Sequence, residues 1–364
     1  MKIFVINLGS TSTKIALYHD ERQQWIENIH HTPEETSRYS CALDQYPFRL
    51  QRIKEALEQA NIPLDFDAII ARGGLLKPIP SGVYRINEAM KHDLLHAQMD
   101  HACNVGALLA DELAQDIGCP TFIADPVVVD EMQEKARLTG IPGIERRSVF
   151  HALNSKAVSR RYAKQVGKSY EELNLIVAHL GGGISVSAHR KGKVIDVNNA
   201  LNGEGPICPD RAGTLPSEQL AELCFSGRYT FQEIRTMICR KGGVMAHLGT
   251  SDMKCIIERV ESGDKHARLV VDAMLYTIAK QIGAMHVALC GQTDAIILTG
   301  GIAYNSFCVD ELTKQICYLA PVAVIPGENE MEALAMNAFW AMRGDLPLKE
   351  YGNKPIQETI DSNL

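Results

Sequence analysis

Apolar residues in this chain gather in short runs that stop at polar or glycine-rich loops. Residues 3–6 and 15–18 are two such runs, rich in β-branched and aromatic side chains, with the sequence Asn-Leu-Gly-Ser-Thr-Ser-Thr-Lys between them. Runs of this length and composition are typical of buried strands. Because only a short polar loop separates them, the pattern predicts a β-hairpin rather than a strand followed by a helix.

A later region repeats this arrangement. Residues 175–178 lead into the sequence His-Leu-Gly-Gly-Gly, and another largely apolar run follows at 184–188. A shift of 179 − 7 = 172 positions superposes Val5 on Val177, Leu8 on Leu180, Gly9 on Gly181 and Ala16 on Ala188. Since 172 is close to half of the 364 residues, both halves are predicted to open with the same hairpin, as a gene duplication would produce.

Helical patterns separate the predicted strands. Apolar residues recur at intervals of three and four over residues 87–114, 148–167, 217–224 and 267–289. Two further strands are predicted at residues 295–299 and 322–325, each followed by a loop and then a helix, the first beginning near Asn305 and the second ending near Arg343. This alternation over 364 residues predicts two α/β domains.

Composition is that of a soluble globular protein, with 46% apolar and 22% charged residues. The net charge is 37 − 44 = −7, so nucleic acid and anionic membranes are not expected partners. The ten cysteines never lie closer than nine positions apart, which excludes a CxxC redox or zinc pair and favours reduced cysteines. The short apolar run before Asn7 is too brief for a signal peptide, and no run approaches the length of a membrane span. A cytoplasmic location is therefore expected.

Three glycine loops follow predicted strands, at residues 8–14, 180–183 and 299–303. Glycine lets backbone N–H groups turn towards an anion, and Ser and Thr add hydroxyl donors, so phosphate is the expected occupant. An ordinary tight turn is the alternative for each loop taken alone. The first loop is not a Walker P-loop, because Thr13 stands where that motif has a glycine before its lysine. It is not a Rossmann loop either, because a strand is predicted after Gly9.

Five segments resemble the motifs of one family. They are Val-Ile-Asn-Leu-Gly-Ser-Thr-Ser-Thr-Lys at 5–14, Ala-Arg-Gly-Gly at 71–74, Arg-Ser-Val-Phe-His at 147–151, His-Leu-Gly-Gly-Gly at 179–183 and Pro-Gly-Glu-Asn-Glu at 326–330. The chain resembles the short-chain carboxylate kinases, or acetokinase family, of the acetate and sugar kinase, heat-shock-70 and actin superfamily. It is shorter than acetate kinases and has Ala-Leu-Asn after His151 where they have Gly-Thr-Ser, which favours the branch that phosphorylates butyrate.

The resemblance implies two duplicated actin-like ATPase domains, with ribonuclease H-like mixed sheets flanked by helices, around a nucleotide cleft. The implied domains are residues 1–148 plus 329–364 and residues 149–328. The implied reaction is direct in-line transfer between ATP and butyrate, or a related short or branched acid, to give ADP and an acyl phosphate. Mg²⁺ would be a cofactor, and a homo-oligomer is expected.

Acyl phosphate formation brings two anions together, so the site needs cations and hydrogen-bond donors. The resemblance assigns Arg72 to the substrate carboxylate and Arg211 to the transferring phosphoryl group. It makes His151 and His179 donors to phosphoryl oxygens and gives Asp125 an orienting role near the acceptor and the metal. From the residues alone, each could instead be structural: a surface arginine for Arg72, an ion pair of Arg211 with Asp210 or Glu204, or a buried histidine with satisfied hydrogen bonds.

The resemblance also assigns ligand contacts in the loops. Nucleotide contacts fall on Gly9, Ser10, Thr11, Ser12, Lys14, Gly181, Gly182, Gly183, Gly300, Gly301, Ile302 and Asn305. Metal contacts fall on Asn7 and Glu330, although an acid such as Glu330 at a helix start could simply stabilise the helix. His101 matches the family pattern less well, and its role stays open.

Two other functions are compatible with parts of the sequence. A sugar or hydroxy-acid kinase would need an aspartate base, and an actin-like or chaperone nucleotide switch would share the glycine loops without needing Arg72 and Arg211. His92 and His96 approximate a zinc-protease motif, but Asp93 stands where that motif has its catalytic Glu, so a hydrolytic zinc site is not expected.

Overall fold

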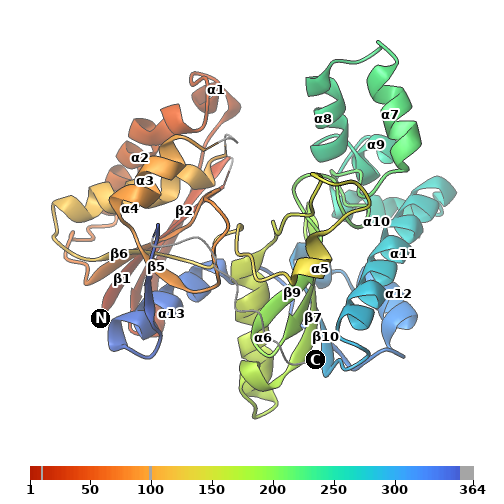
Figure 1. Ribbon diagram of the computed structural model, residues 1–364. Helices are drawn as coiled ribbons and strands as arrows, with labels where there is room; N and C mark the ends of the chain where they lie inside the picture. The colour runs from red at the N-terminus through yellow and green to blue at the C-terminus, as the bar shows by residue number, and fades with distance from the viewer. Residues whose placement is uncertain (10, 98–100, 353–364) are drawn as a thin grey trace. The chain divides into compact units, whose positions relative to one another are not determined.

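A computed structural model describes residues 1–9, 11–97 and 101–352 (Figure 1). It divides into two compact units: unit 1 is Met1–Val129 with Asn329–Leu364, and unit 2 is Asp130–Glu328. Residues 130–148, which the sequence interpretation places in the N-terminal domain, cluster with unit 2. The assignment of the domains implied by the resemblance stays a prediction.

Unit 1 is a seven-stranded mixed sheet of order β12-β5-β6-β4-β1-β2-β3. Strand β1 is antiparallel to β2 and parallel to β4, which is parallel to β6. The elements are β1 (Lys2–Leu8), β2 (Ser12–His19), β3 (Arg22–His30), α1 (Pro33–Thr36), η1 (Leu43–Gln45), α2 (Tyr46–Gln59), β4 (Ala68–Arg72), β5 (Val83–Arg85), α3 (Glu88–Leu95), α4 (Cys103–Gln115), β6 (Thr121–Ala124), α13 (Glu330–Arg343) and β12 (Leu348–Glu350).

Both faces of this sheet are covered by helices. Figure 1 shows α2, α3 and α4 on one side and α13 on the other. Four consecutive residues of β1, from Ile3 to Ile6, are fully buried. A strand reads as a continuous apolar run when both of its faces are packed, which explains the first run in the sequence.

The helix predicted over residues 87–114 is instead two helices, α3 and α4. Helix α3 is amphipathic, with Met90 and Leu94 as its buried residues, and ends at Leu95. Helix α4 is buried on nearly all sides. Because the two segments bury different shares of their surfaces, one straight amphipathic helix cannot satisfy both.

Unit 2 is a five-stranded sheet of order β11-β10-β7-β8-β9. Its elements are α5 (Glu134–Arg137), α6 (Ala152–Gln165), η2 (Tyr170–Glu172), β7 (Asn174–Leu180), β8 (Ile184–Arg190), β9 (Lys193–Val197), α7 (Ser217–Phe225), α8 (Phe231–Cys239), α9 (Gly243–Leu248), α10 (Met253–Glu261), α11 (Lys265–Ala288), β10 (Ala295–Thr299), η3 (Gly301–Tyr304), α12 (Ser306–Ile316) and β11 (Val322–Val324). The remaining predicted helices correspond closely to α6, α7, α11, α12 and α13.

Alternate residues of the central strands of unit 2 face opposite cores. Leu175 and Val177 of β7 pack with Val158 of α6, whereas Ile176 and Ala178 pack in the larger core that contains α11. The period-two alternation of a strand therefore fixes which residues reach which helix layer.

The two sheets share one strand order, which confirms the predicted duplication. Strands β3-β2-β1-β4-β6 correspond to β9-β8-β7-β10-β11, with the same strand directions. The predicted match of Ala16 with Ala188 is wrong by one residue. Val5 pairs with Ala16, whereas Val177 pairs with Ser187, because the turn of the second hairpin is one residue shorter.

A buried polar cluster lies beneath the first glycine turn. Arg49 of α2 is fully buried and donates to the carbonyl of Ser12 at 3.0 Å and to Thr13 Oγ1 at 3.1 Å. The Thr13 hydroxyl lies 2.8 Å from His31 Nε2. Since Thr13 Oγ1 accepts from Arg49, its proton is free to be donated to a neutral His31 ring. Burial, together with the charge of Arg49, lowers the pKa of His31 to about 4.

This cluster predicts a loss of stability in mild acid. The pKa of His31 is about 4 in the folded state against 6.5 unperturbed, so the unfolded chain binds the proton more readily. The contribution of His31 to the free energy of unfolding should therefore fall by up to about 1.4 kcal/mol per pH unit between pH 6.5 and pH 4. Urea midpoints measured across this window should depend less on pH in His31→Gln than in the unaltered protein. The exposed neighbour provides the control, since His30→Gln should leave that dependence unchanged; equal slopes for all three proteins would contradict the prediction.

Candidate functional site

In unit 1 the structure brings together three of the predicted site residues. Asn7 lies near the end of β1 and Arg72 at the end of the neighbouring parallel strand β4, so both reach the same edge of the sheet. Glu330, the first residue of α13, is buried against them. Its Oε2 accepts from Asn7 Nδ2 at 2.7 Å and from Arg72 Nη1 at 3.1 Å. The cluster is one buried carboxylate held by one amide and one cation.

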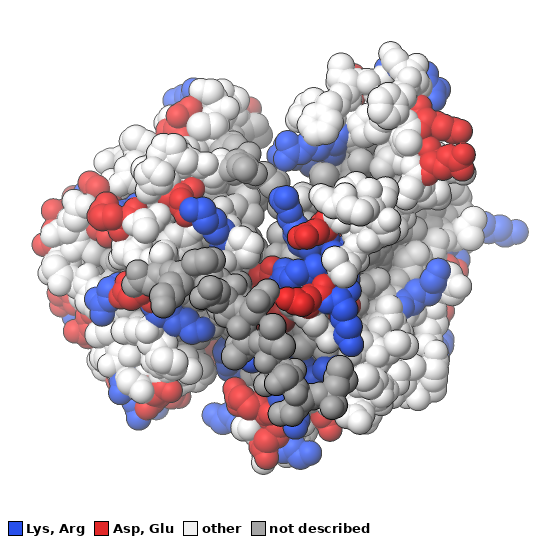
Figure 2. Space-filling view, viewed as in Figure 1, with Lys and Arg blue, Asp and Glu red and all other residues white. Residues whose placement is uncertain are grey.

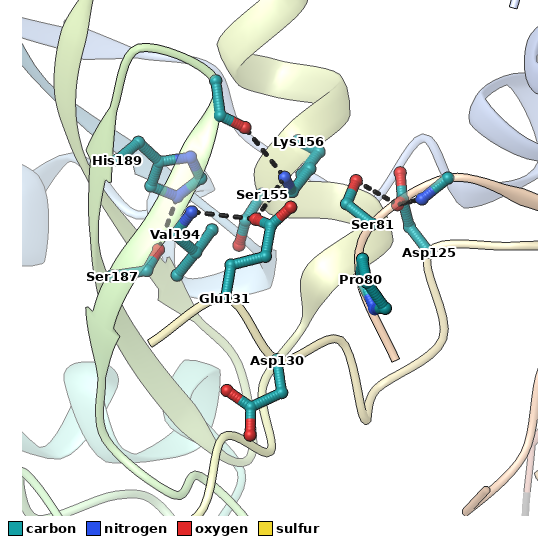
Figure 3. A network of polar contacts seen from close by, with 12 residues as sticks. Pro80, Ser81, Asp125, Asp130, Glu131, Ser155, Lys156, Ser187, His189 and Val194 are labelled. Carbon is teal, nitrogen blue, oxygen red and sulfur yellow. Dashed lines mark hydrogen bonds and ion pairs between the residues drawn. The ribbon is translucent and has the colours of Figure 1, made fainter. Parts of the chain in front are cut away.

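Asp125 follows β6 and has a φ of 39°, in the left-handed region. Its Oδ1 accepts from Ser81 Oγ at 2.6 Å and from the backbone N–H of Gly82 at 2.9 Å (Figure 3). The side chain therefore holds the turn before β5. The orienting role assigned to Asp125 stays a prediction.

The histidines of the region around α3 and α4 make local contacts. His101 Nδ1 accepts from the backbone N–H of Cys103 at 3.2 Å and lies 2.9 Å from its thiol sulfur. His92 and His96 stack on each other with ring centroids 4.3 Å apart. Among the residues that the structure describes, no three His, Cys, Asp or Glu side chains are placed to hold a metal ion together.

The first glycine turn is held by its own backbone. The N–H of Gly9 donates to the carbonyl of Ser12 at 2.9 Å, and the carbonyl of Thr11 accepts from the backbone of His31. Lys14 is the cross-strand partner of Asn7, which places both side chains on the same face of the sheet. Ser10, a predicted nucleotide contact, lies outside the described residues.

In unit 2 the two predicted histidines are stacked. His179, in β7, is fully buried, and His151 immediately precedes α6. Their ring centroids lie 3.7 Å apart with the ring planes within 7° of parallel. His151 Nδ1 lies 3.0 Å from the hydroxyl of Ser185 on β8. The duplication places His179 where unit 1 has Asn7.

A chain of hydrogen bonds defines the proton position on His179. The hydroxyl of Thr299 donates to the carbonyl of Gly327 at 3.1 Å, so its oxygen accepts from Asn154 Nδ2 at 3.2 Å. The same amide nitrogen donates to His179 Nδ1 at 2.9 Å. The His179 proton is therefore on Nε2, which donates to Glu328 Oε1 at 3.0 Å.

Two residues in this series of hydrogen bonds, Asn154 and Glu328, were not predicted from the sequence as site residues. The Ala-Leu-Asn sequence that contains Asn154 served only to separate branches of the family. Glu328 lies in the motif that contributed Glu330. A signal for both was present in the sequence, but their partner, His179, is distant along the chain.

Arg211 lies directly over the second glycine turn. A Cβ added to Gly183 would overlap its Nη1, so the guanidinium occupies the space that a side chain there would fill. Arg211 Nη1 donates to the carbonyl of Ala200, and its Nε is 3.7 Å from Asp210 Oδ1. Burial raises the pKa of the Asp210 carboxyl.

One sequence alternative for Arg211 was an ion pair with Asp210 or Glu204. In the structure Arg211 and Asp210 form an ion pair with a separation of 3.7 Å, which is longer than a hydrogen bond. Glu204 pairs instead with Arg146, whose Nε lies 2.6 Å from its Oε1.

The third glycine loop is joined to the turn before α13. Gly300 and Gly327 exchange two backbone hydrogen bonds, of 3.2 and 3.0 Å. Gly300 has a φ of 86°, and a Cβ there would lie 2.5 Å from the Leu180 carbonyl oxygen, so only glycine fits without strain.

The predicted contacts that follow Gly300 lie at the start of a helical region. Gly301 and Ile302 belong to the short 3₁₀ helix η3. The side-chain oxygen of Asn305 accepts from the backbone N–H of Cys308 at 3.0 Å, so Asn305 caps α12. Their predicted contacts with nucleotide stay predictions.

The surface shows no dominance of either charge sign on the face in view. Lys and Arg side chains are interspersed with Asp and Glu (Figure 2). Within the described residues, no helix is both long enough and apolar enough to cross a membrane.

Two mixed sheets of matching strand order, each with glycine turns at its strand ends, define an actin-like ATPase fold, as predicted. The chain belongs to the acetokinase family, whose model matches residues 135–338. A probable butyrate kinase of Phocaeicola vulgatus is 63% identical over 351 residues, covering 96% of this chain and 99% of that protein. Butyrate kinase 1 of Clostridium acetobutylicum is 47% identical over 352 residues, covering 96% and 99%. The predicted family is confirmed.

Solved structures of low sequence identity share the fold. Acetate kinase of Porphyromonas gingivalis superposes with a TM-score of 0.78 at 20% identity, covering 94% of this chain and 99% of that one. A propionate kinase of Francisella tularensis gives 0.75 at 19% identity, covering 92% and 98%.

The contact between Gly183 and Arg211 predicts a glycine requirement at one position of the second turn. Gly183→Ala should displace the guanidinium and lower phosphotransfer turnover by about tenfold or more, because the resemblance assigns this cation to the transferring phosphoryl group. Gly283→Ala in α11 is the control, since a Cβ there would meet no atom within 4 Å and the position lies outside the loops assigned to the nucleotide. Steady-state kinetics and thermal unfolding of both variants test this. Equal turnover in the two variants would show that the guanidinium position is unimportant.

Proposed function

We propose that this chain is an ATP-dependent carboxylate kinase that catalyses ATP + butanoate = ADP + butanoyl phosphate, or the same reaction on a related short or branched acid. Its membership of the acetokinase family and its full-length relatives named as butyrate kinases support the reaction class. The observation that carries the proposal is that the candidate residues offer cations and N–H donors, while the carboxylates of Glu330, Asp125 and Glu328 already accept hydrogen bonds from the protein.

The acceptor needs no base. A carboxylic acid is ionised at pH 7, so its oxygen is ready to attack a phosphoryl group. Asp125 Oδ1 already accepts two hydrogen bonds, from the Ser81 hydroxyl and from the backbone N–H of Gly82, and so holds a turn. A sugar kinase would instead require a carboxylate poised as a general base.

Arg72 is proposed to bind the substrate carboxylate. Its guanidinium is partly exposed and already pairs with a carboxylate, Glu330, in a geometry that a second carboxylate could share. Planar guanidinium groups match carboxylate oxygens in paired hydrogen bonds, which would orient the attacking oxygen.

The phosphoryl group is proposed to be stabilised from unit 2. Arg211 supplies a cation beside the turn 181–183, and His179 and His151 supply ring N–H donors. Phosphoryl transfer depends chiefly on positioning and on offsetting charge over the equatorial oxygens. These groups can meet that requirement without a covalent intermediate.

A Mg²⁺ ion is proposed to accompany ATP, held by Glu330 and, through water, by Asn7. The donor set fits, because Mg²⁺ commonly takes one or two protein carboxylates and completes its shell with phosphate oxygens and water. When bound, the ion would offset the negative charge of the phosphates. Arg72 and Asn7 both engage Glu330 Oε2, so the carboxylate is fixed in place before any ligand arrives.

The remaining ligand and location assignments follow the same proposal. The nucleotide would contact the turns at 9–14, 181–183 and 300–305, with the adenosine against Gly300, Gly301 and Ile302. A cytoplasmic location agrees with ten free cysteines. A homo-oligomer is expected from the family resemblance.

A hydroxylamine trap tests the reaction itself. Incubation of the protein with ATP, Mg²⁺, butanoate and hydroxylamine should yield the hydroxamate, because hydroxylamine captures an acyl phosphate. Acids from two to six carbons should be compared, since a single methylene changes binding by only about 1–3 kcal/mol. A folded, nucleotide-binding sample that gives no hydroxamate with any of them would rule the proposal out.

Substitution of the two arginines should separate their roles. Arg72→Lys should raise the KM for butanoate more than the KM for ATP, because an ammonium group can still pair with Glu330 but cannot bind a carboxylate through paired hydrogen bonds. Arg211→Ala should lower kcat by about a hundredfold or more while nucleotide still binds, because it removes charge stabilisation of the transfer step. Arg228→Ala, at an exposed position, should alter neither constant. Unchanged kinetics in either site variant would remove the role assigned to that arginine.

A further inference from the structure

The carboxylate of Glu328 accepts a hydrogen bond from the same His179 N–H group that the proposed mechanism uses. His179 Nε2 donates to Glu328 Oε1 at 3.0 Å, and the same N–H is the group proposed to donate to a phosphoryl oxygen. One N–H cannot make two full hydrogen bonds in the same direction. A bound phosphoryl oxygen and the Glu328 carboxylate therefore exclude one another at this position.

The histidine is the fixed partner of this pair. Its ring is fully buried, its Nδ1 is held by Asn154, and its face is stacked on His151. Rotation of the ring would break the bond to Asn154 and would leave one of the two N–H groups of that buried amide unsatisfied, which is costly. The Nε2–H direction is thus set by the fold.

Glu328 is the movable partner. Its side chain is 45% exposed and has three rotatable bonds, so it can turn into water. The backbone before it is held, because Gly327 is joined to Gly300 by two hydrogen bonds and a Cβ on Gly327 would meet the Tyr304 hydroxyl at 2.5 Å. Ligand entry can therefore displace the carboxylate without moving the turn.

We propose that Glu328 is an internal anion that occupies the phosphoryl-oxygen position on His179 and lowers the affinity of this site for phosphoryl ligands. This inference rests on the proposed function of His179. Each binding event would exchange one charge-assisted hydrogen bond for another, and the outgoing carboxylate would be hydrated. A phosphoryl group would thus be released more readily than from an N–H donor without a competing carboxylate. After its release, the Glu328 carboxylate again accepts the hydrogen bond from His179 Nε2.

The alternative is that Glu328 merely orients His179. The two explanations predict opposite changes in the affinity for phosphoryl ligands when the carboxylate is removed. An orienting carboxylate would improve phosphoryl binding, so its removal would weaken affinity. A competing carboxylate lowers phosphoryl binding, so its removal strengthens affinity.

Calorimetric titration of the full-length protein, with EDTA present to exclude metal effects, provides the test. Inorganic phosphate and ADP are the phosphoryl probes, and adenosine is the probe without phosphate. Glu328→Gln keeps the shape and removes the charge, and Glu328→Ala removes the acceptor. Glu332→Gln is the matched control, because it removes the same charge at an exposed position four residues later.

Glu328→Gln and Glu328→Ala should bind inorganic phosphate about three- to tenfold more tightly than the unaltered protein, the upper figure corresponding to about 1.4 kcal/mol. Adenosine affinity should be unchanged in both, and Glu332→Gln should match the unaltered protein. Weaker or equal phosphate binding in both Glu328 variants, with adenosine binding intact, would overturn the proposal. An equal gain in Glu332→Gln would also overturn it, by showing a general charge effect.

This outcome is independent of the proposed reaction. The hydroxamate assay on the unaltered protein tests whether the chain is a carboxylate kinase, whereas the titration reports only on anion binding at His179. A protein that makes butanoyl phosphate but shows no gain in phosphate affinity would lose the Glu328 inference alone.

Discussion

The parallel pairing of one hairpin strand with the next strand of its sheet decides where the candidate functional groups lie within each unit. In unit 1, β1 pairs with β4, and in unit 2, β7 pairs with β10. Parallel strands end at a common edge, so side chains that are far apart in the sequence meet there. Arg72 reaches the position of Asn7 in this way, and Thr299 reaches the position of His179.

At the strand ends of each sheet, the candidate groups form short ion pairs and hydrogen bonds with neighbouring acids. The chain as a whole carries a net charge of −7, yet the candidate groups are arginines and N–H donors placed beside individual acids. In unit 1, Glu330 holds Arg72 and Asn7 on one oxygen. In unit 2, Glu328 Oε1 accepts a hydrogen bond from His179 Nε2. These two acids are two residues apart in the sequence, where the chain passes from unit 2 into unit 1.

The duplication shows how one scaffold came to hold different groups. Both units begin with a hairpin, a third antiparallel strand and a parallel neighbour. Asn7 in the first copy corresponds to His179 in the second, and the second turn is one residue shorter. That shortening moves the cross-strand register by one residue, so Ser187 takes the place of Ala16. The offset of 172 was visible in the sequence, but the change in register was not, because pairing depends on turn geometry.

The amino-acid sequence predicted the local elements, and its resemblance to a known family predicted the chemistry. Apolar runs, helical spacing and glycine loops predicted the two hairpins, most of the helices and the loops that carry Arg72, His179, Arg211 and Glu330. Long-range packing sets which groups are partners. Asn154 is 145 residues from Thr299, and Glu328 is 149 residues from His179, so no local pattern could indicate either contact. The break between α3 and α4 and the buried Arg49 cluster have the same origin, since burial and long-range hydrogen bonds are set by packing rather than by local preference.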